Sequence, residues 1–180
     1  MKLAFYMSSA LLSLSLTAAS GCTSGNARDG NAGGPVAMTT EAPGEGASVS
    51  LRGRVDPLAP SQVVLDVVAR GAADLHGAAF RMTWDPEAIT FVSATSGTPW
   101  SKQVLAMAKE GSPGQLAVLW TEKGETGIDA SHETVIGTVT FAPRGRQGSP
   151  IAFKTERSQL VDKQGVPIVA TWTGGSLAAR

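Results

Sequence analysis

The strongest constraint on the fold is an alternation of apolar and polar side chains that recurs in short blocks from Ser48 onward. Side chains on a β-strand point alternately to the two faces of its sheet, so this period of two predicts strands with one buried face. Gly, Pro, Asp and Ser separate the blocks, and no stretch has the period of a helix of ordinary length. The pattern predicts an all-β fold, a two-sheet antiparallel β-sandwich of roughly eight or nine strands. The blocks are Val63–Val68, Phe80–Trp84, Leu116–Trp120, Val135–Phe141, Ile151–Phe153 and Val166–Trp172.

In two of these blocks the alternation assigns residues to the core face and to the surface most clearly. Phe80, Met82 and Trp84 are expected on the core face of one strand, and Leu116, Val118 and Trp120 on the core face of another. The residues between them should face outward. These outward residues are Ala79, Arg81, Thr83, Ala117, Leu119 and Thr121.

The segment Leu75–Ala94 carries a more specific signature. A Gly precedes the strand, an aromatic-Asp-Pro turn ends it, and Ile89 and Phe91 follow two residues apart. Pro86 lacks an N–H and favours an extended backbone at Asp85, so the strand should end at this point. The Asp85 side chain should then accept hydrogen bonds from backbone N–H groups of the turn. Further segments that carry the signature follow along the chain. They are Gly97, Gly137–Phe141, Gly148 before Ile151, and Leu160–Gly165.

Together these blocks, which cover about residues 49–177, resemble the bacterial cohesin family, the β-sandwich modules of cellulosome scaffolds. The resemblance implies a jelly-roll sandwich and a non-catalytic recognition role, because cohesins bind dockerins, small calcium-bound helical modules, through one exposed sheet face. The outward residues above would then form a flat docking patch around Leu119. Two other readings of Leu119 remain open: a neighbouring strand covers it, or it is a scattered exposed apolar residue. The chain departs from the family pattern at Trp84, where Tyr is usual, and has no Asn from Ser48 onward.

Carbohydrate binding is the alternative, as in a module that acts in polysaccharide binding or breakdown. Sugars stack on exposed Trp or Tyr rings, and from Ser48 onward the candidates are the four tryptophans, since the one tyrosine is Tyr6. Trp84 and Trp120 fall on core faces, and the facing of Trp172 is undetermined. Trp100 follows Thr98-Pro99 in an expected loop and is the candidate for an open ring.

An envelope enzyme is the third and least supported reading. Acid and base catalysis needs paired groups in a pocket, and the carboxylates here fall in polar turns. His76 and His132 have no Cys or neighbouring His at ligand spacing, so neither a catalytic residue nor a metal or other cofactor is predicted. A calcium ion held by Glu122, Glu125 and Asp129 is possible, but such loops are usually only solvated.

The beginning of the chain predicts export and a lipid anchor. Lys2, an apolar run over residues 3–16 and small residues up to Gly21 form a secretory leader that is too short to span a bilayer. Cys22, the only cysteine, stands where a lipoprotein would be cut and acylated. Residues 23–47 are rich in Gly, Ser, Thr, Ala and Pro and are expected to be a flexible tether, followed by one domain over residues 48–180.

The net charge and the expected location limit the classes of partner that this chain could bind. The chain holds 15 Lys and Arg and 15 Asp and Glu, and loss of Lys2 with the leader leaves a net charge of −1. Nucleic acid is therefore not expected as a partner. Thr23, rather than Asp, after the acylated cysteine favours the outer membrane. We expect a lipid-anchored protein of the cell envelope with a protein or glycan partner.

Overall fold

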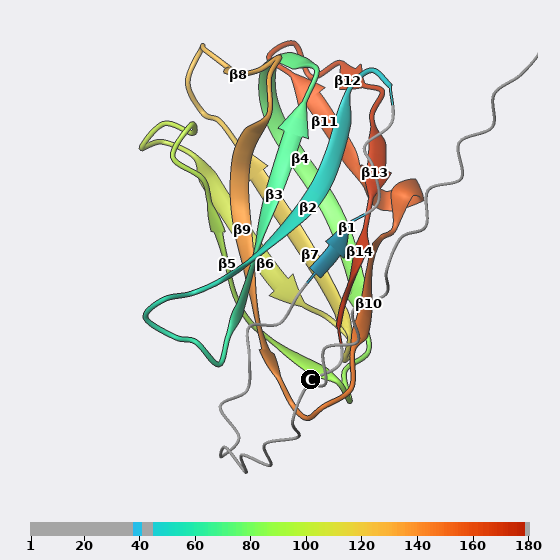
Figure 1. The fold of residues 1–180 in the computed structure, drawn as a ribbon. Coiled ribbons are helices and arrows are strands. Elements are labelled where there is room, and N and C mark those ends of the chain that lie inside the picture. The colour runs from blue at the N-terminus through green and yellow to red at the C-terminus, as the bar shows by residue number, and fades with distance from the viewer. Residues whose placement is uncertain (1–37, 41–44, 179–180) are drawn as a thin grey trace, which may run out of the picture. The chain divides into compact units, whose positions relative to one another are not determined.

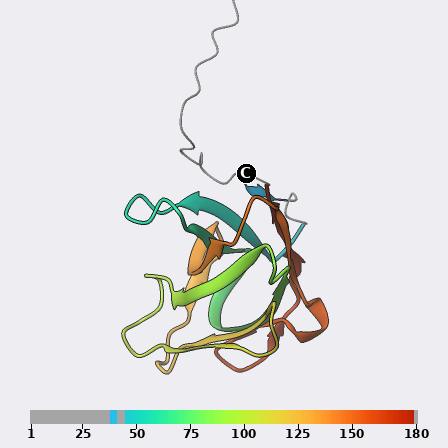
Figure 2. The same cartoon turned by 90° about the horizontal axis from the view of Figure 1, so that it is seen from below.

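Two β-sheets pack face to face in the computed structural model, which describes residues 38–40 and 45–178 (Figure 1). The sheets hold fourteen strands, nine in the larger and five in the smaller. The view along the strands shows the layers from one end (Figure 2). The predicted two-sheet sandwich is thus confirmed.

The larger sheet is organised around the long strand β4. One edge of β4 pairs with β7 and β8, and the other edge pairs with β10 and β11. Beyond these, β6 extends the sheet from β7, β12 extends it from β11, and β14 and β1 extend it from β10. A single 3-10 turn, η1, joins β10 to β11. The bounds are β1 Met38–Thr40, β4 Ala72–Trp84, β6 Leu105–Glu110, β7 Gln115–Thr121, β8 Ile128–Ala130, β10 Ser149–Phe153, η1 Thr155–Arg157, β11 Gln159–Asp162, β12 Pro167–Ile168 and β14 Gly175–Leu177.

The smaller sheet has the order β13-β2-β3-β9-β5. Its middle strand β3 is buried from Val63 to Ala69, as expected for a strand covered on both sides. Asp66 within it is 8% exposed, and its carboxylate accepts a hydrogen bond from Arg54 at 3.0 Å. The bounds are β2 Ser48–Val55, β3 Val63–Arg70, β5 Ile89–Ser96, β9 Thr134–Pro143 and β13 Thr171–Thr173.

Aromatic side chains fill the space between the sheets. Phe80 meets Trp120 edge-on, with ring centroids 5.3 Å apart, and Trp84 meets Phe141 in the same way at 5.1 Å. Such edge-to-face pairs add to the free energy gained by burying the rings. All the core residues predicted on β4 and β7 are buried, which confirms the assignment of the inner faces.

The turn predicted after Trp84 is also present. The Asp85 carboxylate accepts a hydrogen bond from the Glu87 N–H at 2.9 Å, and the Asp85 carbonyl accepts one from the Ile89 N–H at 3.1 Å. β4 ends at Trp84, two residues before Pro86, and the chain continues into β5 in the opposite sheet.

Three features of the fold differ from the sequence-based expectation. First, β1 lies within the expected tether and pairs antiparallel with β14, so the tether prediction is wrong at Met38–Thr40. Second, eight or nine strands were too few, because edge strands of two to four residues, such as β12, are too short to show a period. Third, β13 runs parallel to β2, an exception to the antiparallel pairing.

The beginning of the chain lies outside the described residues. This applies to the expected leader, to Cys22 and to residues 23–37 of the expected tether. In the part that the structure describes, no helix has the length and apolar character needed to cross a membrane.

Candidate functional site

The outer face of the larger sheet is built by β11, β4, β7 and β6, whose pairing aligns their outward side chains in rows. Residues directly opposite each other on paired strands share a face of the sheet, so the register fixes these rows. We use "outer face" for the following three rows. They are Gln159, Ala79, Leu119 and Met107; then Arg81, Ala117 and Lys109; and then Thr121 and Leu105.

All six residues predicted to face outward lie on this side of the sheet. Arg81 is exposed, and the other five are partly exposed: Ala79, Thr83, Ala117, Leu119 and Thr121. Leu119 lies between Ala79 on β4 and Met107 on β6. Because Leu119 stays partly exposed, its side chain contributes to an apolar centre within the sheet surface.

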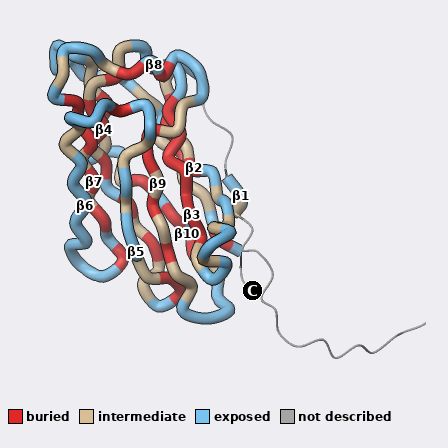
Figure 3. Tube along the Cα trace, turned by 90° about the vertical axis from the view of Figure 1, so that its left-hand side faces the viewer, coloured by how far each residue is buried: buried red, intermediate tan, exposed pale blue. Residues whose placement is uncertain are grey.

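Strand β6 supplies three of the four outer-face residues that sequence reasoning missed, and the fourth is Gln159 on β11. β6 pairs only with β7 among the described strands, and five of its six residues are exposed (Figure 3). Met107 is 57% exposed, which is unusual for so large an apolar side chain. In the sequence of β6, large side chains alternate with Ala106 and Ala108. The stretch contains no β-branched residue, however, and such residues are the usual mark of a strand.

Trp100, the candidate for an open aromatic ring, is buried, and the expectation that it lies open is wrong. Its side chain is 6% exposed, and its indole N–H donates a hydrogen bond to the Ile136 carbonyl at 2.6 Å. The same carbonyl accepts the Gly97 N–H at 2.9 Å. The loop before Trp100 is therefore folded back onto β9, and the ring completes the core instead of facing solvent.

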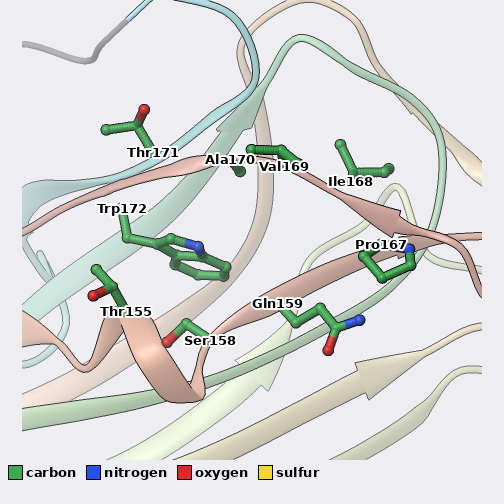
Figure 4. Close-up of a pocket in the computed structure, with 9 residues that line it drawn as sticks. All are labelled: Thr155, Ser158, Gln159, Pro167, Ile168, Val169, Ala170, Thr171 and Trp172. Carbon is green, nitrogen blue, oxygen red and sulfur yellow. The ribbon is translucent and has the colours of Figure 1, made fainter.

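Trp172 is the remaining tryptophan and is half-buried at a second surface feature (Figure 4). It lines a hollow of about 530 Å³ between η1 and β11 on one side and the segment from β12 to β13 on the other. Its ring also packs edge-on against Phe153, with centroids 5.2 Å apart, and lies 6.0 Å from the ring of Phe80. A single ring that is held by two core phenylalanines offers less stacking area for a sugar than an open platform would.

Two of the three loop carboxylates considered as calcium ligands, Glu122 and Asp129, accept hydrogen bonds from neighbouring groups, and the third, Glu125, is exposed. Glu122 is 5% exposed, and its carboxylate accepts bonds from the Ser101 N–H and hydroxyl and from the N–H groups of Lys123 and Gly124. These bonds, the Ser101 hydroxyl first among them, lower the pKa of Glu122 to about 2 against the opposing effect of burial. Glu122 therefore fastens the segment at Ser101 to the end of β7.

The Asp129 carboxylate also accepts hydrogen bonds from a nearby serine, but fewer than Glu122 does. The donors are the Ser131 hydroxyl at 2.5 Å and the Ser131 N–H at 2.9 Å, and these bonds lower the pKa of Asp129. Residues 38–40 and 45–178 contain no group of three or more His, Cys, Asp or Glu side chains that could hold a metal ion. The histidines lie apart from any such group: His76 is half-buried in β4, and His132 is exposed before β9.

Comparison with solved structures identifies the fold. The sixth cohesin of scaffoldin B from Acetivibrio cellulolyticus, in complex with a mutant dockerin, has a TM-score of 0.62 and 20% identity, with 75% of this chain and 99% of that one covered. The cohesin module of a family 33 glycoside hydrolase from Clostridium perfringens has a TM-score of 0.58 and 13% identity, covering 74% and 95%. A non-cellulosomal cohesin from the archaeon Archaeoglobus fulgidus has a TM-score of 0.54 and 13% identity, covering 67% and 82%.

No protein-family model and no curated protein matches the chain. The structural likeness shows that the chain has the fold of a cohesin module, as the sequence resemblance predicted.

Proposed function

We propose that this domain is a non-catalytic module that binds a protein partner through the outer face. The observation that carries the proposal is the open row of Ala79, Leu119 and Met107, which forms an apolar strip across three neighbouring strands. Several solved cohesins with this fold are in complex with dockerins, which supports a protein partner for this chain as well.

The composition of the outer face suits reversible docking. Protein interfaces combine an apolar centre with a polar rim, and a few central side chains contribute most of the binding free energy. Here the apolar strip is flanked by Arg81, Lys109 and Gln159. The charges Lys109 and Glu110 at the end of β6 also disfavour the pairing of this edge strand with another sheet.

Replacing Leu119 by arginine is expected to weaken partner binding by about 100-fold, because a long charged side chain in the centre of an interface blocks contact and must lose its hydration. The measurement is capture of partners from the envelope of the parent cells by the wild-type chain, identification by mass spectrometry, and calorimetric titration of the purified partner with each variant.

Leu58→Arg is the matched control, since Leu58 is 94% exposed and lies between β2 and β3, strands of the smaller sheet. It should bind the partner like the wild type. Unchanged binding by the Leu119→Arg variant would contradict the proposal. If binding instead depended on Trp172, the hollow beside that ring and a glycan ligand would become the better hypothesis.

We further propose that Cys22 is acylated and anchors the domain to the cell envelope, in the outer membrane. The support is the sequence of the leader, with Ser20 and Gly21 immediately before the cysteine and Thr23 after it. Cys22→Ser should abolish the incorporation of labelled palmitate and move the protein into the soluble fraction, as measured by fractionation and autoradiography. A variant that keeps the label would rule out this anchor.

A further inference from the structure

Two cations flank the same small residue on the outer face. Arg81 on β4 and Lys109 on β6 are each directly opposite Ala117 on β7. Neighbouring strands lie about 4.8 Å apart, so the two backbones that carry these cations are separated by roughly 10 Å. Only the methyl group of Ala117 stands between them, which leaves room for a small group from outside.

The space between the two cations is a hollow of about 190 Å³. Arg81, Lys109, Gln115 and Ala117 line it, together with Leu116 and Gly111. The β6–β7 turn that closes one end is fixed by a hydrogen bond from the Gly111 N–H to the Gln115 carbonyl at 3.0 Å. The position of Gln115 beside the cations is therefore set by the backbone.

Neither cation is neutralised by a carboxylate within the described chain. Arg81 and Lys109 are both exposed, and the ion pairs among residues 38–40 and 45–178 involve other cations, namely Arg52, Arg54 and Lys163. Two unpaired positive charges on either side of a hollow attract an anion, and the guanidinium fork of arginine matches the two oxygens of a carboxylate.

We propose that Arg81 and Lys109 together bind a carboxylate of the protein partner, an Asp or Glu side chain that enters the hollow above Ala117. This inference rests on the proposed docking function and deepens it. The adjacent row of Leu119 and Met107 favours a protein side chain over a free anion, because the partner would present an acidic group beside an apolar one. The ion contact would orient the partner along the strands while the apolar row supplies most of the contact area.

The test uses the full chain, labelled with ¹⁵N, and glutarate as the carboxylate probe at constant ionic strength. Glutarate should cause saturable shifts of the amide signals of Lys109, Gly111 and Ala117. The double substitution Arg81→Gln with Lys109→Gln should weaken glutarate binding by at least about tenfold, because both charge-assisted hydrogen bonds are lost. Arg146→Gln, at an exposed loop residue, is the control and should bind glutarate like the wild type.

Other arms of the experiment separate this inference from docking itself. Leu119→Ser should lose partner binding but keep glutarate binding, because both cations remain. If the Leu119→Arg variant binds a captured partner like the wild type while the double variant loses glutarate binding, docking through the apolar row fails and the carboxylate site stands. The inference is overturned if glutarate produces no saturable shift, if inorganic phosphate binds more tightly than glutarate, or if the double variant binds a captured partner as well as the wild type.

Discussion

Replacing Gly137 by alanine is expected to lower the free energy of unfolding by about 3 kcal/mol, among the largest effects of adding one methyl group. A Cβ atom at this position of β9 would meet the six-membered ring of Trp120, 2.5 Å from Cζ3 and 2.6 Å from Cζ2. Trp120 is fully buried and packs edge-on against Phe80, so its ring has no free space to move into. Urea denaturation of the two proteins measures the difference.

Two further variants show whether the clash is the cause. Gly145→Ala should change stability by less than about 0.5 kcal/mol, because a Cβ there has no neighbour within 4 Å. Trp120→Phe removes the outer ring atoms that the new methyl group meets, together with an indole N–H that is buried without a partner among the described residues. The double variant should therefore be more stable than the sum of the single effects predicts. Additive effects would contradict a direct clash.

The inner faces of the strands could be predicted because hydrophobic burial enforces a strict period. Phe80, Met82 and Trp84 point inward because sheets packed on one another must alternate core and surface positions. The Asp85-Pro86 turn was predictable for a different reason, since proline removes a backbone donor wherever it occurs. Both signals are local, and neither depends on knowing which strands become neighbours.

The position of Trp100 could not be predicted because it depends on an irregularity in a distant strand. The pairing of β3 with β9 shifts register at one point: Val67 pairs with Gly137, but Val68 pairs with Val135. Ile136 therefore has no partner on β3. Ile136 turns into the core, and its carbonyl is left to accept the N–H of the Trp100 ring. Val135 and Ile136 are both β-branched and apolar, so the sequence does not indicate which of them the bulge buries.

The outer face was predictable in two of its four strands. The rows on β4 and β7 follow from the alternation that buries Phe80 and Trp120. No such alternation marks β6, because nearly all of its residues are exposed and neither face has to be apolar. As a result Met107 and Lys109, which complete the apolar and the basic rows, appear only once the pairing of β6 with β7 is known.

Glu122→Gln is expected to lower the free energy of unfolding at pH 7 by about 2 kcal/mol, because the amide replaces one of the two acceptor oxygens by a donor that faces other donors. The folded-state pKa of about 2 lies below the ordinary value of 4.5, so the ionised carboxylate stabilises the native state above pH 4.5. That contribution falls as the pH decreases from about 4.5 to about 2, where the wild-type side chain takes up a proton. The difference in stability between wild type and variant should shrink over the same range, as measured by denaturation at a series of pH values.

The Ser101 hydroxyl provides an independent check, since it is the largest cause of the lowered pKa. Ser101→Ala should raise the pKa of Glu122, so the ionised carboxylate should contribute less stability than in the wild type. The loss of that contribution on acidification should still begin near pH 4.5 but should be complete at a higher pH. Glu125→Gln changes an exposed carboxylate nearby and should change the free energy of unfolding at pH 7 by less than about 0.5 kcal/mol. A wild-type-to-Glu122→Gln difference that stays constant from pH 7 to pH 2 would show that shape, and not charge, is what the native state requires at this position.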